Sequence, residues 1–193
     1  MNFFKKLFGS SVSPSEEEQK EAEGKEFDVL KYDGMRAFKT GETAFAIECF
    51  RHALRLQEDL EVRDYLSQAL IQSNELLKTY DELQKLADAE PDNIQIVIRM
   101  AHVAYMMENY TVMGDACERG KLLDKDNVDI NYLYARACLG MGDLVNTIAM
   151  LTKTISLDED CVSAYQLRGE TLLKMGDVEG ADADVAWLLN HDE

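Results

Sequence analysis

Apolar residues recur with the spacing of amphipathic helices through most of this chain, and the pattern repeats itself. Short polar segments separate the helical patterns, and they contain Gly41, Asn74, Glu108, Gly142 and Gly176. The intervals between these five residues are 33, 34, 34 and 34 residues. A period this regular predicts an array of helix–turn–helix repeats.

The turns contain residue types that commonly end one helix and begin the next. A helix commonly ends at a residue in the left-handed backbone conformation, and an acidic residue after it suits the start of the next helix. Glycine and asparagine adopt the left-handed conformation readily, whereas Glu108 does not suit it. We therefore expect the third turn to be irregular.

The repeats stay in register between the turns. They begin at Phe27, Leu60, Ile94, Val128 and Val162. The eighth position is always small, as expected where paired helices approach closely: Gly34, Ser67, Ala101, Ala135 and Gly169. The eleventh position is apolar: Ala37, Leu70, Ala104, Cys138 and Leu172. The twenty-fourth is apolar too: Phe50, Leu83, Cys117, Leu151 and Val185. We expect these positions to form the seam between helices.

This register resembles the tetratricopeptide repeat, a 34-residue helix–turn–helix unit. The resemblance covers five consecutive repeats: 27–59, 60–93, 94–127, 128–161 and 162–193. It implies an all-α fold, a right-handed α-solenoid of ten repeat helices. The chain departs from the family pattern in two respects. Asp33 and Arg168 occupy a usually apolar position, and only the second repeat ends in the expected proline, Pro91.

Residues 1–26 lie outside the array. Residues 9–14 read Gly-Ser-Ser-Val-Ser-Pro, which is typical of a linker. Ser15 and Glu18 then have the spacing of a capping box, which predicts that a helix begins there. The pattern leaves open whether this helix continues through Gly24 into the first repeat or breaks at that glycine.

Composition and charge limit the classes of partner and the cellular location that we expect for this chain. The 193 residues carry a net charge of -17, which would repel a phosphate backbone, so we expect no nucleic-acid partner. The four cysteines lie far apart, and we expect buried thiols in a reducing cytoplasm. No secretory signal and no apolar stretch of membrane-spanning length is present, so we expect a cytoplasmic chain that begins at Met1.

The sequence contains no recognisable catalytic motif. The three histidines, His52, His102 and His191, stand in no metal-ligand motif. We therefore expect no enzymatic activity, no cofactor and no metal site.

The resemblance implies a binding groove instead. Positions two, five, nine and twelve of each first helix face the concave side in this family. The candidate groove residues are Lys31, Met35, Phe38, Gln68, Ile71, Ile98, His102, Tyr105, Tyr132, Arg136, Leu139, Gln166 and Glu170. Their apolar and aromatic content predicts a site for a peptide or partner helix. At position twelve, burial against the neighbouring repeat is an equal alternative. Family members that bind chaperone tails use a lysine, asparagine and arginine set, of which only Lys31 and Arg99 match, so we do not expect that activity.

We therefore predict a protein–protein interaction scaffold or adaptor. Two alternatives stay open. One is a membrane-peripheral assembly factor, docked on a membrane or partner through Phe3, Phe4, Lys5, Lys6, Leu7 and Phe8, with weak contact to the membrane surface. The other is a dedicated chaperone for secreted hydrophobic proteins. At the other end of the chain, either the last helix tolerates exposure, or Trp187 and Leu189 form a homodimer contact.

Overall fold

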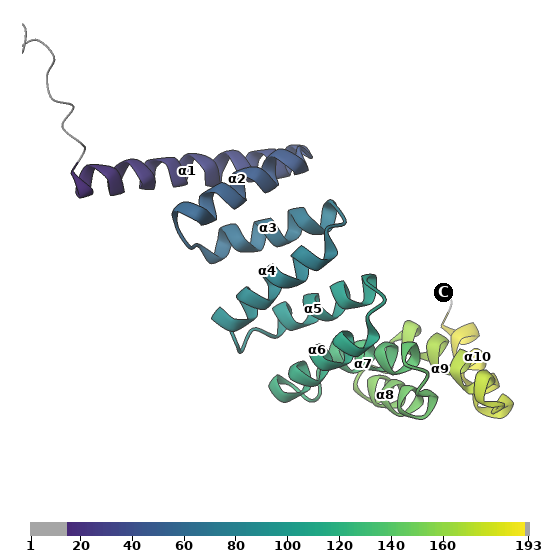
Figure 1. Ribbon diagram of the computed structural model, residues 1–193. Coiled ribbons are helices and arrows are strands. Elements are labelled where there is room, and N and C mark those ends of the chain that lie inside the picture. Colours follow the sequence, from purple (N-terminus) through teal and green to yellow (C-terminus); the bar gives the residue numbers. More distant parts are fainter. Residues whose placement is uncertain (1–14, 192–193) are drawn as a thin grey trace, which may run out of the picture. The chain divides into compact units, whose positions relative to one another are not determined.

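The computed structural model describes residues 15–191, and every regular element in that range is an α-helix (Figure 1). The ten helices of this range are α1 (Glu16–Thr40), α2 (Thr43–Leu56), α3 (Leu60–Gln72), α4 (Leu76–Ala89), α5 (Ile94–Met106), α6 (Tyr110–Leu123), α7 (Val128–Gly140), α8 (Leu144–Leu157), α9 (Val162–Met175) and α10 (Val178–Asn190). They form five consecutive helix pairs. The predicted fold class, an all-α solenoid of helix–turn–helix repeats, is confirmed.

The chain forms two compact units, Met1–Ala69 and Leu70–Glu193, with the boundary inside α3. In the N-terminal unit, α1 packs on α2 through the predicted small position. A Cβ added to Gly34 would lie 2.6 Å from the Cε1 atom of Phe50, so only glycine leaves room for this ring. Phe50 is fully buried, and Tyr65 stacks on it with ring centroids 5.8 Å apart.

Helix α1 begins with the predicted capping box. The Ser15 hydroxyl accepts a hydrogen bond from the amide of Glu18 at 3.3 Å, and the Glu18 carboxylate accepts one from the amide of Ser15 at 2.8 Å. The helix runs without a break through Gly24 to Thr40. Residues 16–26 and the first repeat helix are therefore one helix.

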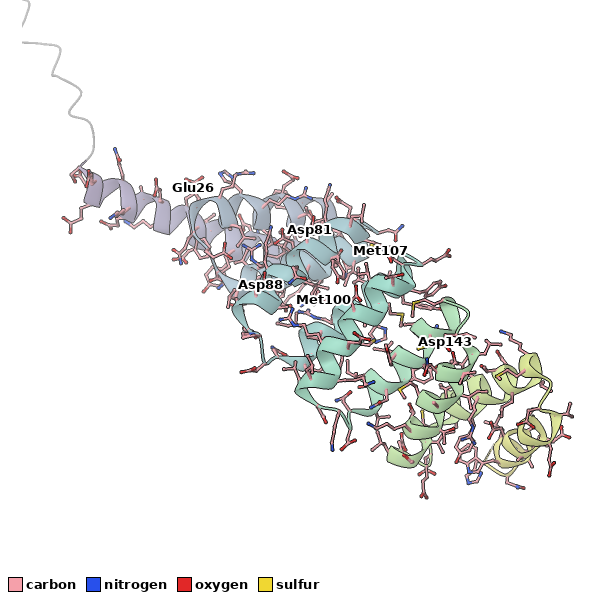
Figure 2. All side chains as sticks on the ribbon, turned by 60° about the horizontal axis from the view of Figure 1, so that its bottom comes forward. Glu26, Asp81, Asp88, Met100, Met107 and Asp143 are labelled. Atoms are coloured by element: carbon pink, nitrogen blue, oxygen red, sulfur yellow. The ribbon has the colours of Figure 1, made fainter. Side chains whose placement is uncertain are left out.

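The C-terminal unit has two buried apolar clusters. The larger joins α4, α5, α6 and α7 through side chains such as Leu83, Val97, Met113 and Ile130. Met100 and Met107 of this region are labelled in Figure 2, and Met100 is 3% exposed. The smaller cluster joins α7, α8 and α9 and consists of Ala135, Leu151, Ile155, Ala164 and Tyr165. Position eight is buried in all five repeats, and position twenty-four in the first four.

All five turns contain a residue with positive φ at the predicted place: Gly41, Asn74, Glu108, Gly142 and Gly176. Glu108 has φ 55°, so the expectation of an irregular third turn is wrong. Its amide donates to the Tyr105 carbonyl at 2.9 Å, and the next amide, of Asn109, donates to Ala104 at 2.9 Å. The same two hydrogen bonds surround Gly142. They satisfy the end of the helix, and they hold Glu108 in a conformation that its own side chain disfavours.

The acidic residues after the turns cap only some of the helices. Asp143, labelled in Figure 2, accepts a hydrogen bond from the amide of Asn146 at 3.1 Å, and Asp177 accepts one from the amide of Gly180 at 3.0 Å. Glu42 forms no side-chain cap to α2. The shorter aspartate side chain reaches the first-turn amides, which agrees with its known preference for this position.

The two charged residues at a usually apolar position are paired. Arg168 donates to both carboxylate oxygens of Asp184, at 2.6 and 3.0 Å, and Asp184 is 2% exposed. Asp33 accepts from Arg36 at 2.8 Å on the surface of α1. An ion pair thus takes the place of apolar packing in the last repeat.

Two further findings bear on the sequence predictions. Cys49, Cys117 and Cys138 are free and buried, and Cys161 is free and partly buried. Within residues 15–191, no helix combines the length and the apolar character needed to cross a membrane. The predicted docking residues Phe3 to Phe8 lie outside the described residues.

Candidate functional site

The strongest candidate site lies on α5 and α7, the first helices of two successive repeats. Arg136 of α7 places its guanidinium carbon 3.8 Å from the ring centroid of Tyr105 on α5. The same carbon lies 5.9 Å from the ring centroid of Tyr132, one turn earlier on α7. A guanidinium on the face of an aromatic ring is attracted by its quadrupole. The two tyrosines therefore hold the Arg136 side chain in place.

Arg136 has no acidic partner within the described residues, although the protein is strongly acidic. Two other cations, Lys31 and Arg168, each contact a carboxylate at 3.0 Å or less. An aromatic face leaves the N–H groups of a guanidinium available, because the ring binds the cation without accepting all of its hydrogen bonds. Arg136 can therefore donate to an acceptor on another molecule.

A pocket of about 190 Å³ opens beside this arginine. Its lining residues come from four helices and are Tyr105, Tyr110, Arg136, Leu139, Gly140 and Leu167. The ring of Tyr110 lies directly on Gly140, where any Cβ would overlap it. Tyr105 and Tyr110 meet edge to face, with centroids 6.3 Å apart. The pocket thus has aromatic and aliphatic walls with one cation at its side.

The structure brings together four of the predicted groove residues in the C-terminal unit: Tyr105, Tyr132, Arg136 and Leu139. All four are partly exposed. Ile98 is different, because it is 7% exposed and belongs to the buried cluster. Its burial therefore argues against Ile98, one of the predicted groove residues, as a surface anchor.

The remaining candidates of the C-terminal unit are scattered. Ile71 is partly buried and packs against the larger apolar cluster. His102 is exposed on α5. Gln166 and Glu170 are exposed on α9 and line a different hollow, between α9 and α10. None of these four lines the pocket beside Arg136.

In the N-terminal unit, Lys31 is engaged within the fold. Its ammonium lies 3.0 Å from Asp59 and 2.7 Å from Glu61, and its side chain is only 15% exposed. The hydrogen bonds to Glu61 and Asp59 raise the pKa of Lys31 despite its partial burial. Lys31 therefore links α1 to the start of α3 and is not free for a ligand.

The other candidates of this unit also contact their neighbours. Phe38 meets Tyr65 edge to face with centroids 6.0 Å apart, and Gln68 donates to Asp64 at 2.8 Å. Met35 is partly buried on α1.

Sequence reasoning missed three pocket residues: Tyr110, Gly140 and Leu167. They lie at repeat positions outside the stripe assigned to the groove. One signal was available, because Gly140 is a second glycine just before the turn glycine Gly142. A glycine at a helix end that the turn does not require indicates close packing, here against the Tyr110 ring.

The described part of the chain holds no grouped metal ligands, and the buried Cys117 thiol is not activated. No group of three or more histidine, cysteine, aspartate or glutamate side chains in residues 15–191 is arranged to hold a metal ion. Burial raises the pKa of Cys117 to about 12. This thiol therefore stays protonated at neutral pH and is a poor nucleophile.

No protein-family model matches the sequence, and no curated protein matches it. Solved structures nevertheless share its fold. A crystal structure of MamA protein matches with a TM-score of 0.79 and 18% identity, covering 88% of this chain and 93% of that one. The chain is similar in fold to MamA. MamA 41-end from Desulfovibrio magneticus RS-1 matches with a TM-score of 0.77 and 16% identity, covering 86% of this chain and 95% of MamA 41-end. At these identities the likeness to MamA concerns the helical-repeat fold alone.

Proposed function

We propose that this protein is a non-enzymatic interaction scaffold of the tetratricopeptide-repeat type, and that it binds a peptide or a partner helix on the face formed by α5, α7 and α9. The helical-repeat fold supports this proposal, because stacked repeats present a preformed surface. A preformed surface loses little conformational freedom on binding. Free thiols such as those of Cys49 and Cys117 suit a cytoplasmic location.

A single observation carries the proposal: Arg136 is held by two tyrosine rings beside an apolar pocket and has no acidic partner among residues 15–191. Arginine and tyrosine, with tryptophan, are the residue types enriched where binding energy concentrates in protein interfaces. The pocket fits one bulky apolar side chain. The guanidinium fits a carboxylate or a backbone carbonyl of the same partner segment.

Selection from a random peptide display library tests this function. We expect the full chain to enrich peptides that have a bulky apolar residue near an acceptor-rich or acidic position. Binding of the selected peptides should fall at least tenfold with Arg136→Glu and with Tyr132→Ala, a loss of about 1.4 kcal/mol or more.

The matched control is Arg55→Glu, the same change of charge at an exposed position on α2. It should leave peptide binding unchanged, and circular dichroism should show the same helical content for every variant. Peptides whose binding depends on neither Arg136 nor Tyr132 would exclude this face as the binding site.

A further inference from the structure

The last helix leaves a row of side chains uncovered. Val178, Asp182, Val185 and Leu189 follow one another at helical spacing on one flank of α10. The three apolar members are 57%, 47% and 73% exposed, and Asp182 is exposed as well. This exposure is unusual for the repeat, because position twenty-four, here Val185, is fully buried in the first four repeats.

The same row is partly covered one repeat earlier. Its counterparts on α8 are Leu144, Ile148, Leu151 and Ile155. Leu151 is 0% and Ile155 8% exposed, and both belong to the cluster that contains Ala164 and Tyr165 of α9. The first helix of the following repeat, together with Ala135 of α7, therefore buries the half of this flank formed by Leu151 and Ile155, while Leu144 and Ile148 stay partly exposed. The flank of α10 has the same construction but no following helix within the described chain.

Helix α1 leaves exposed a position that is buried in the first helices of the other four repeats. Position three of each first helix is Val29, Val62, Ile96, Ile130 or Ala164, and the last four are 0–3% exposed. Val29 is 59% exposed, and its neighbour Tyr32 is 66% exposed. Arg36, one turn further on, has a side chain that is 75% exposed. Helix α1 thus presents the flank that other first helices turn toward a preceding repeat.

The packing of α6 on α7 shows which positions meet in such a junction. A Cβ on Gly114 of α6, at position twenty-one, would lie 4.0 Å from Ala137 of α7, at position ten. Ile130, at position three, lies directly on Gly120, at position twenty-seven. If α1 of one copy packs on α10 of another in this way, position ten is Arg36 and position twenty-one is Asp182. Val29 then lies opposite Leu188.

We propose that copies of this chain associate head to tail, with α10 of one copy packed against α1 of the next. The exposed valines and leucine of α10 meet Val29 and Tyr32, and Arg36 meets Asp182 at the centre of the contact. Arg36 is available because its ion pair with Asp33 is an exposed contact within one helix, and such pairs are weak. A contact between two different faces adds one copy after another, and it gives a ring if the rotation between copies closes and an open chain if it does not.

Charge favours this arrangement over a two-fold contact between two α10 helices. Among its exposed residues, helix α10 carries Glu179 and Asp182 and no basic residue, whereas Asp184 is buried in its ion pair with Arg168. Two such helices would therefore place like charges together, whereas α1 offers Arg36. Trp187, which one of the two sequence alternatives placed with Leu189 in a homodimer contact, stacks within its own chain, with its ring centroid 3.7 Å from that of Tyr165 and 4.0 Å from that of His191. The exposed member of that predicted pair is Leu189.

Sedimentation velocity of the full chain over a wide concentration range tests the proposal, at an ionic strength of about 0.15 M where the repulsion of net charges is screened. We expect the weight-average mass of the wild type to rise with concentration beyond that of a dimer. Arg36→Glu and Asp182→Arg should each weaken association at least tenfold. The controls are Arg55→Glu on α2 and Asp81→Arg on α4, which make the same charge changes at exposed positions on other helices and should associate as the wild type does.

A mixture of the two charge variants tests whether α10 of one copy contacts α1 of another. The Arg36→Glu and Asp182→Arg variants should associate with each other when mixed, because each offers the charge that the other needs. The chain with both substitutions should associate like the wild type. A monomer at every wild-type concentration, or association that Arg36→Glu leaves unchanged, would overturn the proposal. So would a mixture that remains as weakly associated as its two components.

Discussion

The turn at Glu108 offers a quantitative test of the repeat architecture. Glu108 is exposed, has φ 55°, and forms no side-chain hydrogen bond or ion pair with another described residue. A residue with a Cβ pays about 1–2 kcal/mol for the left-handed conformation. Glycine avoids this cost but loses about 0.4–1 kcal/mol more through the entropy of the unfolded chain. Glu108→Gly is therefore expected to raise the free energy of unfolding by about 0.5–1 kcal/mol.

Urea unfolding followed by circular dichroism measures this change, and an unchanged m-value confirms that the unfolded state is comparable. Glu170→Gly is the matched control, because Glu170 is exposed within α9 and has helical geometry. There the same substitution should lower the free energy of unfolding by about 0.5–1 kcal/mol. If Glu108→Gly destabilises the protein as Glu170→Gly does, the left-handed turn at Glu108 does not exist in solution.

Three further predictions concern other parts of the fold. Ala135→Leu should lower the free energy of unfolding by about 1–3 kcal/mol, because it overpacks a site that is 0% exposed. Its control, Ala149→Leu on the exposed side of α8, should change that free energy by less than about 0.5 kcal/mol in the same urea assay. Asp184→Ala should lower the free energy of unfolding by about 3–5 kcal/mol because it leaves the Arg168 charge without its partner. The Arg168→Met/Asp184→Leu double variant, which removes both charges, should melt within a few degrees of the wild type. Equal losses of stability in the two variants would refute the ion-pair argument. Burial alone would raise the pKa of Asp59, but the hydrogen bonds from the Val62 amide and from Lys31 outweigh it and lower that pKa. The stability that ionised Asp59 contributes is present above about pH 4 and is lost as the pH falls through the lowered pKa of Asp59. In Asp59→Asn, the urea midpoint should therefore fall less steeply at acid pH than it does in the wild type.

The repeat pattern was predictable because it depends on local rules. Helical periodicity, a small residue at position eight and a left-handed residue at each turn follow from backbone sterics within one repeat. These rules placed Gly34 against Phe50 and the turns at Gly142 and Gly176. They failed at Glu108, because the preference of one residue is weaker than the two hydrogen bonds and the packed helices that enclose it.

The candidate site was predictable only in part. A stripe at helical spacing identified Tyr105, Tyr132 and Arg136 as neighbours on one face. It could not distinguish Ile98, which lies in the buried cluster formed by α4, α5, α6 and α7, from residues that stay on the surface. Nor could it show that Lys31 is engaged by Asp59, since that ion pair joins residues 28 positions apart.

What the sequence determined by itself is the architecture: an all-α array of helix pairs, the turn places and the buried seam, all encoded at short range and repeated about every 34 residues. Only the tertiary structure decided which side chains remain available for contact. Long side chains such as those of Arg136 and Arg168 can reach several neighbours, and the packing of the helices around them determines which one they contact. Arg168 finds Asp184 and is neutralised inside the fold, whereas Arg136 finds two tyrosine rings and keeps its donors for another molecule.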